Sequence, residues 1–202
     1  MPEIEIGKFT LESLTTGMYN NPEIVYREYI QNAVDSFDNA VSQKLMNPDD
    51  CRIEVIVDAY RQEISIKDNG TGIGKELAVK TLLDIGNSTK IHTSNRGFRG
   101  IGRLGGLSYC KKLSFCTSAQ NETEKTLVTF DCVKLKELLI PGQATEYNLQ
   151  KVISAVTEIR VLSEQASAHY FIVKMEGVDD ISTLLDVEFV KDYVAQVAPV
   201  PF

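Results

Sequence analysis

Glycine and acidic residues are distributed very unevenly along the chain, and this constrains its middle third more than any other feature. Nine of the 13 glycines fall between Gly70 and Gly106, and the 37 residues from 85 to 121 contain no Asp or Glu. The same stretch carries six lysines and arginines. Glycine lets backbone N–H groups approach a ligand closely, and local positive charge favours an anion, above all a polyphosphate. A flexible surface loop of chance composition is the alternative.

The overall composition is that of a folded chain with an acidic surface. Hydrophobic residues make up 43% and charged residues 24% of the 202 positions, which is enough for one large domain or two small ones. The net charge of −7 disfavours a general binder of nucleic acid or anionic membranes. We therefore predict no direct contact with nucleic acid and none with membranes.

Cysteine and histidine usage indicates a reducing compartment and no zinc centre. The four cysteines show neither CxxC nor disulfide-framework spacing, and His92 and His169 lie far apart. The N-terminus lacks the basic and apolar regions of a signal peptide, and no apolar run approaches the roughly 18 residues of a membrane span. We therefore expect a cytoplasmic protein with reduced thiols.

Hydrophobic periodicity predicts a single α+β domain over residues 1–202, with helices layered on one mostly antiparallel sheet. Period-two alternation predicts an antiparallel pair, 52–60 with 63–68, and further strands at 113–117, 125–133 and 170–175. The ambiguous region 134–168 includes a possible strand at 158–162. Helical spacing predicts helices at 22–45, 74–85, 101–111 and 187–197, the first with Asn21 as N-cap and Pro22 at its first position.

The first of these helices carries a polar stripe. Glu28, Asn32 and Asp35 stand at i, i+4 and i+7, within about 60° of one another on a helix, and the opposite side is apolar. Carboxylate and carboxamide oxygens suit Mg²⁺, and a carboxylate can act as base toward water. The alternative is the solvated face of an amphipathic helix.

A second motif follows the strand at 63–68 and reads Asp68-Asn69-Gly70-Thr71-Gly72-Ile73-Gly74. Asp68 shares the strand side of Ile64 and Ile66, so its carboxylate points into the apolar layer and needs a donor. A purine exocyclic amine is one such donor. An Asp/Asn-Gly turn of a hairpin is the alternative.

A third motif is the glycine cluster between Gly97 and Gly106. Gly100-x-Gly102-x-x-Gly105 formally matches the dinucleotide fingerprint, but no strand precedes it, and the chain has no GxxxxGK[ST] loop. The remaining interpretation is a phosphate cradle at a helix start, with Arg96, Arg99 or Arg103 nearby. For Gly105-Gly106 tight helix packing is the favoured interpretation.

In this order the three motifs resemble the ATP-binding domain shared by gyrase B, heat shock protein 90, histidine kinases and MutL, the GHKL or Bergerat fold. Glu28-x-x-x-Asn32-Ala33-x-Asp35 matches the N box, Asp68-x-Gly70-x-Gly72 the first glycine box, and Gly97-x-x-Gly100-x-Gly102 the second. The entry into the first helix, residues 20–33, is similar to heat shock protein 90. The resemblance covers residues 10–115 well and implies a two-layer α/β sandwich.

The resemblance also implies roles, ligands and partners. Glu28 would be the general base and Arg27 its tuning neighbour, Asn32 would bind Mg²⁺, and Asp35 would support the ribose or water network. Asp68 would accept from the adenine amine, with Gly70, Gly72 and Ile73 against the base. Residues 86–96 would be a lid, and the phosphates would lie on Gly97, Gly100, Ile101 and Gly102. The ligands would be ATP or ADP with Mg²⁺. The partners would be downstream domains of a longer protein and a second copy of that protein, with no client assigned.

The chain departs from the pattern in one place that bears on adenine. The family places a Gly-Thr before a late strand, whereas here Thr157 follows Val156 and the late strand is led by His169-Tyr170. That role is therefore assigned to no residue. The leading hypothesis is a slow ATPase module like that of heat shock protein 90. The alternatives are a MutL-, gyrase- or MORC-type DNA-linked ATPase and a nucleotide-gated binding module without turnover.

Overall fold

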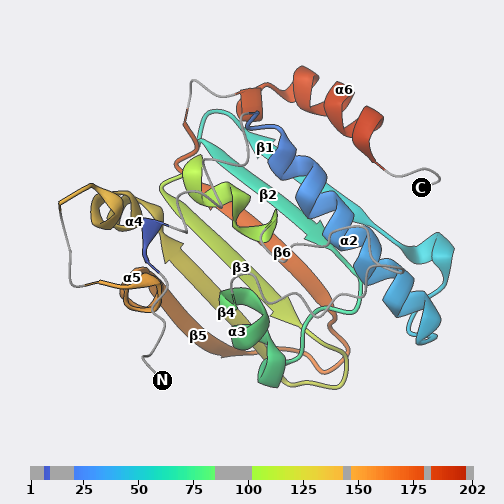
Figure 1. The fold of residues 1–202 in the computed structure, drawn as a ribbon. Helices are drawn as coiled ribbons and strands as arrows, with labels where there is room; N and C mark the ends of the chain where they lie inside the picture. Colours follow the sequence, from blue (N-terminus) through green and yellow to red (C-terminus); the bar gives the residue numbers. More distant parts are fainter. Residues whose placement is uncertain (1–6, 10–20, 85–101, 143–146, 180–182, 199–202) are drawn as a thin grey trace.

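A single antiparallel sheet organises the computed structural model, which describes residues 7–9, 21–84, 102–142, 147–179 and 183–198 (Figure 1). Six strands run in the order β1-β2-β6-β3-β4-β5, and every neighbouring pair is antiparallel. The strands are β1 (Ile53–Asp58), β2 (Glu63–Asp68), β3 (Lys112–Ser118), β4 (Glu124–Asp131), β5 (Thr157–Ser163) and β6 (Tyr170–Glu176). The predicted α+β class is confirmed, as is the uncertain strand at 158–162.

Helices cover one face of this sheet, with α2 and α3 lying across the strands in Figure 1. The α-helices are α2 (Ile24–Ser42), α3 (Lys75–Leu83), α4 (Cys132–Leu139), α5 (Leu149–Val156) and α6 (Val187–Val197). The described ranges also contain the short 3₁₀-helices η1 (Pro48–Asp50), η2 (Gly102–Ser108) and η3 (Thr183–Leu185). The strand predicted at 125–133 ends two residues early, at Asp131, because the Asp131 side chain accepts from the Lys134 N–H and caps α4.

The predicted start of the first helix is wrong by two residues. Residues 21–23 form a turn in which the Asn21 carbonyl, rather than its side chain, accepts from the Ile24 N–H at 3.2 Å. Glu23 is therefore the N-cap of α2, and it makes no capping side-chain hydrogen bond.

The helix predicted at 101–111 is present in shorter form, as the 3₁₀-helix η2 over residues 102–108. A Cβ at Gly106 would lie 2.6 Å from the Tyr29 hydroxyl of α2. That hydroxyl accepts from the Gly106 N–H at 3.2 Å and donates to the Arg103 carbonyl at 3.0 Å. Close packing against α2 thus satisfies backbone groups of η2, and the packing role favoured for Gly106 is confirmed.

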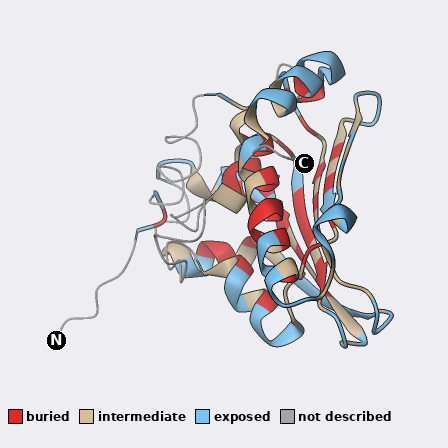
Figure 2. Ribbon diagram, turned by 90° about the vertical axis from the view of Figure 1, so that its right-hand side faces the viewer, coloured by how far each residue is buried: buried red, intermediate tan, exposed pale blue. Residues whose placement is uncertain are grey.

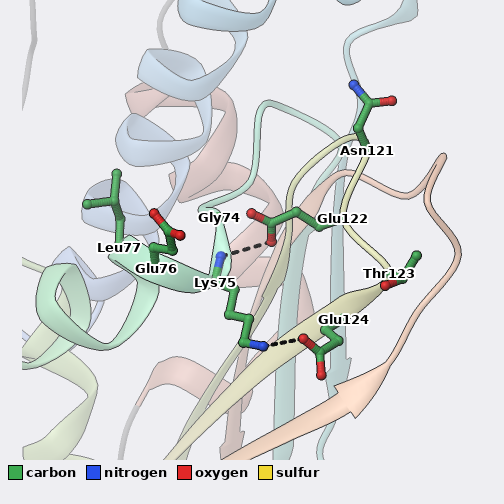
Figure 3. A pocket seen from close by; sticks show the side chains of 8 residues that line it. All are labelled: Gly74, Lys75, Glu76, Leu77, Asn121, Glu122, Thr123 and Glu124. Carbon is green, nitrogen blue, oxygen red and sulfur yellow. Dashed lines mark hydrogen bonds and ion pairs between the residues drawn. The ribbon is translucent and has the colours of Figure 1, made fainter.

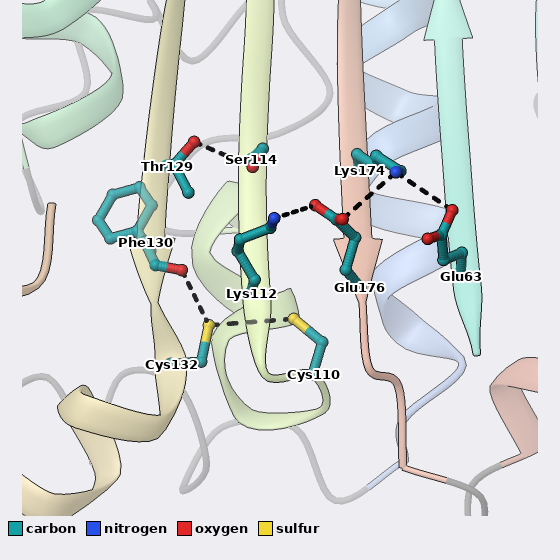
Figure 4. Close-up of polar contacts among 9 residues, drawn as sticks. All are labelled: Glu63, Cys110, Lys112, Ser114, Thr129, Phe130, Cys132, Lys174 and Glu176. Atoms are coloured by element: carbon teal, nitrogen blue, oxygen red, sulfur yellow. Dashed lines mark hydrogen bonds and ion pairs between the residues drawn. The ribbon is translucent and has the colours of Figure 1, made fainter. Parts of the chain in front are cut away.

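The core lies between the sheet and the helices, where Figure 2 shows the buried residues of α2 and the strands. Inward-facing Ile64, Leu113 and Phe115 are each at most 1% exposed. The opposite face carries ion pairs, with Lys112 paired to Glu176 at 2.9 Å and Lys174 to Glu63 at 3.1 Å (Figure 4). One face packed against helices and one bearing charged side chains are consistent with a two-layer architecture.

All four cysteines are free thiols, as predicted. Cys110 and Cys132 lie with their Sγ atoms 3.9 Å apart in the core (Figure 4). Among the described residues, no helix has the length and apolarity needed to cross a membrane.

Candidate nucleotide site

The polar stripe of α2 lies against the protein rather than in solvent. Glu28 and Asn32 are half-buried, and Asp35 is only 4% exposed, whereas Arg27 is exposed. The alternative of a solvated amphipathic face is therefore wrong for these three polar side chains. Burial raises the pKa of Tyr193 in α6, and the positive charge of Arg27 acts to lower it.

Glu28 lies directly against the start of η2. A Cβ built at Gly102 would come within 1.9 Å of the Glu28 Oε2 atom. Any other residue at position 102 would displace the carboxylate or η2, so glycine is required for this close approach. The N-box helix and the second glycine motif are thereby brought together, as the resemblance implies. Gly97, Gly100 and Ile101 lie outside the described residues, and so do residues 86–96.

Asp68 ends β2 with its carboxylate inside the protein. It is 6% exposed and shares the buried side of Ile64 and Ile66, as the alternation predicts. The Gly70 N–H donates to its Oδ1 at 2.9 Å. Burial raises the pKa of Asp68 from 3.8 to about 7, although the hydrogen bonds from Gly70 and Ser36 act to lower it. A further donor at this carboxylate would stabilise its charged form.

The first glycine motif connects β2 to α3 rather than closing a hairpin, so the hairpin alternative is wrong. β2 pairs with β1 and β6, and residues 69–74 lead into α3. Gly72 has a φ of +61°, and a Cβ there would lie 1.9 Å from the Ser118 carbonyl oxygen. A Cβ at Gly70 would lie 2.2 Å from the Ser36 Oγ atom. Both glycines are therefore needed where the motif contacts neighbouring elements.

Two hydroxyl residues that the sequence reasoning missed hold this motif in place. Ser36 Oγ accepts from the Thr71 N–H at 3.0 Å, and Thr117 Oγ1 accepts from the Ile73 N–H at 2.8 Å. Both could have been predicted from their positions. Ser36 follows Asn32 by one helical turn and so lies on the same side of the helix. Thr117 shares the inward side of Leu113 and Phe115, where a polar side chain needs a partner.

The residues considered for the late Gly-Thr role lie far apart. Thr157 begins β5, which is separated from β2 by β6, β3 and β4. His169 precedes β6, and its Nδ1 donates to the Gly70 carbonyl at 2.7 Å. Of the two, only His169 lies beside the first glycine motif.

Arg103 does not take the place expected of a phosphate ligand. Its Nε donates to the Leu82 carbonyl at 3.2 Å and its Nη2 to the Asp84 carbonyl at 2.5 Å, at the end of α3. Arg96 and Arg99 lie outside the described residues.

A separate open pocket of about 390 Å³ lies between the start of α3 and the β3–β4 turn (Figure 3). Its charged residues include three carboxylates, those of Glu76, Glu122 and Glu124, against the single ammonium of Lys75. Lys75 pairs with Glu124, and its backbone N–H donates to Glu122 at 2.8 Å. Because carboxylates repel phosphate, this pocket is unsuited to a nucleotide triphosphate.

Comparison with known families gives a match over most of the chain. Residues 19–167 match the family described as histidine kinase-, DNA gyrase B-, and HSP90-like ATPase. The match spans most of the chain and includes α2, both glycine motifs and five of the six strands. The chain belongs to this ATPase family.

Individual relatives of this ATPase family member carry the name of a chaperone. It is 33% identical over 84 residues to chaperone protein HtpG of Acinetobacter baylyi, covering 39% of this chain and 13% of the relative. It is 34% identical over 92 residues to chaperone protein HtpG of Rickettsia typhi, covering 43% of this chain and 15% of the relative. It is 33% identical over 92 residues to chaperone protein HtpG of Ehrlichia ruminantium strain Gardel, covering 43% of this chain and 14% of the relative. The similarity therefore spans under one sixth of these relatives' length.

Proposed function

We propose that this chain binds ATP and ADP with Mg²⁺ and hydrolyses ATP slowly. The observation that carries the proposal is the contact between Glu28 and Gly102, residues 74 positions apart that belong to two different motifs. A half-buried carboxylate held against a glycine at the start of a helical turn suits a base that acts beside a phosphate group. Membership in the ATPase family supports the same chemistry.

At the adenine end, Asp68 is proposed to accept a hydrogen bond from the exocyclic amine. Its buried carboxylate has a strongly raised pKa, so a donor from the base would offset part of the cost of its charge. Gly70, Gly72 and Ile73 are proposed to lie against the base, in a conformation that the hydrogen bonds of Ser36 and Thr117 fix.

At the phosphate end, Glu28 is proposed to take a proton from the attacking water. As the new bond forms between the water oxygen and the γ-phosphorus, the bond to the bridging oxygen breaks, and ADP and phosphate result. Arg27 is proposed to tune Glu28, and Asp35 to support the ribose or water network. Gly97, Gly100, Ile101 and Gly102 are proposed to hold the phosphates through their backbone N–H groups.

Mg²⁺ fits the donor set on α2. Asn32 supplies a carboxamide oxygen one helical turn from the Glu28 carboxylate, and Mg²⁺ in nucleotide sites takes few protein ligands beside phosphates and water. When bound, the ion would neutralise charge on the phosphates. Asn32 is the residue proposed to hold it.

The wider role proposed is that of a chaperone-type module like heat shock protein 90, in which nucleotide binding controls a larger, dimeric protein in the cytoplasm. The similarity to HtpG proteins supports this proposal. The domain alone is proposed to act on adenine nucleotide, without direct contact to nucleic acid. A MutL-, gyrase- or MORC-type DNA-linked ATPase is the second candidate, since the matched family description includes DNA gyrase B.

Replacing Glu28 separates binding from hydrolysis. Glu28→Ala and Glu28→Gln should lower turnover by about 100-fold or more, the usual contribution of a general base, and should leave the Kd for ATP near that of the parent. Glu54→Gln removes an exposed carboxylate on β1 and serves as the matched control. Parent-like phosphate release from both Glu28 variants would exclude Glu28 as the base and favour a nucleotide-gated module without turnover.

A further inference from the structure

Arg103 links three elements around the candidate site. Its guanidinium donates to the carbonyls of Leu82 and Asp84, the last turn of α3 and the residue after it, at 3.2 and 2.5 Å. Its own carbonyl accepts from the Tyr29 hydroxyl of α2 at 3.0 Å. α3, α2 and η2 therefore meet at this one residue.

An arginine is well matched to this place. Carbonyl groups at the C-terminal end of a helix carry partial negative charge, which favours a cation there. The planar guanidinium presents donors at fixed angles, so Nε and Nη2 can serve two carbonyls at once, whereas a lysine ammonium is a point charge on a flexible stem. Burial lowers the pKa of Arg103, and the nearby Asp84 charge acts to raise it.

The link matters because of what adjoins it on both sides. Gly102 precedes Arg103 and lies against the Glu28 carboxylate, while Glu28 precedes Tyr29, whose hydroxyl bonds the Arg103 carbonyl. The neighbouring pairs Glu28-Tyr29 and Gly102-Arg103 thus contact each other twice. A shift of η2 relative to α3 would be transmitted directly to the place where Gly102 meets Glu28.

We propose that Arg103 is a positioning residue, which fixes η2 against α3 and thereby holds Glu28 in the geometry needed for hydrolysis. The inference rests on the proposed function, because it takes Glu28 as the base. Arg103 itself contacts backbone carbonyls of the protein and acts through Gly102 and Glu28.

The test compares Arg103→Met and Arg103→Lys with a control that removes the same kind of contact elsewhere. Lys8 is buried, and its Nζ donates at 2.7 Å to the Leu138 carbonyl near the end of α4. Lys8→Met therefore removes a buried cation from a helix terminus away from α2 and η2. For each variant we would measure kcat and KM for ATP, and the Kd for ADP by calorimetry.

Arg103→Met should lower kcat by about tenfold to a hundredfold, the size of effect that small misplacement of a reacting group produces. The Kd for ADP should change much less than kcat, because the adenine contact at Asp68 is not touched. The kcat of Arg103→Lys should lie between those of Arg103→Met and the parent. If Arg103→Met does not fold, the kcat of Arg103→Lys alone tests the inference. Lys8→Met should keep the parent kcat. Parent-like kcat in the Arg103 variants would overturn the inference while leaving the proposed function in place.

Hydrogen exchange gives a readout that needs no nucleotide. The Gly106 N–H donates to the Tyr29 hydroxyl, so its protection reports the docking of η2 on α2. It should exchange faster in the Arg103 variants than in the parent or in Lys8→Met. If the parent does not hydrolyse ATP, the proposed function fails, and unchanged Gly106 exchange in the Arg103 variants would separately refute the link.

Discussion

Asp68→Asn should weaken nucleotide binding while stabilising the empty protein at alkaline pH. The substitution keeps the shape of the side chain and removes its charge. In the parent the carboxylate is 6% exposed, and its hydrogen bonds come from Gly70 and Ser36. An essential binding residue that costs stability is expected where a site is arranged for a ligand rather than for folding.

The stability effect follows from the raised pKa. The pKa of Asp68 rises from 3.8 to about 7 in the folded protein, chiefly through burial, and the difference corresponds to about 4 kcal/mol. The folded state binds the proton more tightly than the unfolded state. The stabilisation that comes from protonated Asp68 is therefore complete below pH 3.8 and is lost as the pH rises through about 7. Asparagine has no charge to bury, so the variant should lack this loss, and about 4 kcal/mol is the upper bound of its gain at pH 8.

The binding effect has the opposite sign. Asp68→Asn turns an acceptor into an amide whose N–H₂ faces the adenine amine, and a buried unsatisfied donor costs about 1–3 kcal/mol, or roughly fivefold to 150-fold in Kd. Denaturant unfolding at pH 5 and pH 8 and calorimetric titration with ADP measure both effects. Asp131→Asn is the control, since it keeps a good N-cap on α4. An unchanged Kd for ADP, or a variant less stable than the parent at pH 8, would refute this reasoning.

Two glycine substitutions test the close approaches in the site. Gly102→Ala places a Cβ 1.9 Å from the flexible Glu28 carboxylate, so turnover should fall about tenfold or more while folding stability is largely kept. ADP binding should fall less than turnover, because the adenine contact at Asp68 is unaltered. Parent-like turnover would contradict the contact. Gly72→Ala combines a φ of +61° with a Cβ 1.9 Å from the Ser118 backbone oxygen, which cannot move away. It should cost about 2 kcal/mol or more in unfolding free energy, and a thermal melting point equal to the parent's would be inconsistent with that clash.

Local pattern was enough to predict most of the fold. Alternating residues such as Ile64 and Ile66 face the core, and this period indicated β1 and β2. Short apolar runs indicated β3, β4 and β6, whereas β5 was expected only as an uncertain strand. The α-helices α4 and α5, which were not predicted, have only eight residues each, too few for a clear helical period. The helix expected after the second glycine cluster is the shorter 3₁₀-helix η2, and its glycine at 106 packs against Tyr29, a contact that local pattern does not contain.

The candidate site was predictable in part for the same reason. The inward side of Asp68 follows from strand alternation, and the shared stripe of Glu28 and Asn32 follows from helical spacing. The contact between Glu28 and Gly102 depends on how α2 packs on η2, which no local pattern contains. The use of Arg103 at the end of α3 was likewise out of reach, since a basic residue beside glycines favours a phosphate contact until its tertiary partners are known.

The most direct test of the proposed nucleotide site is calorimetric titration of Mg²⁺–ADP into this chain, with a cooperative unfolding transition measured first to establish that it is folded. We predict saturable binding at a single site per chain, weakened by Asp68→Asn. A folded chain that takes up no ADP would contradict the assignment of Asp68, Glu28 and Gly102 to a nucleotide site.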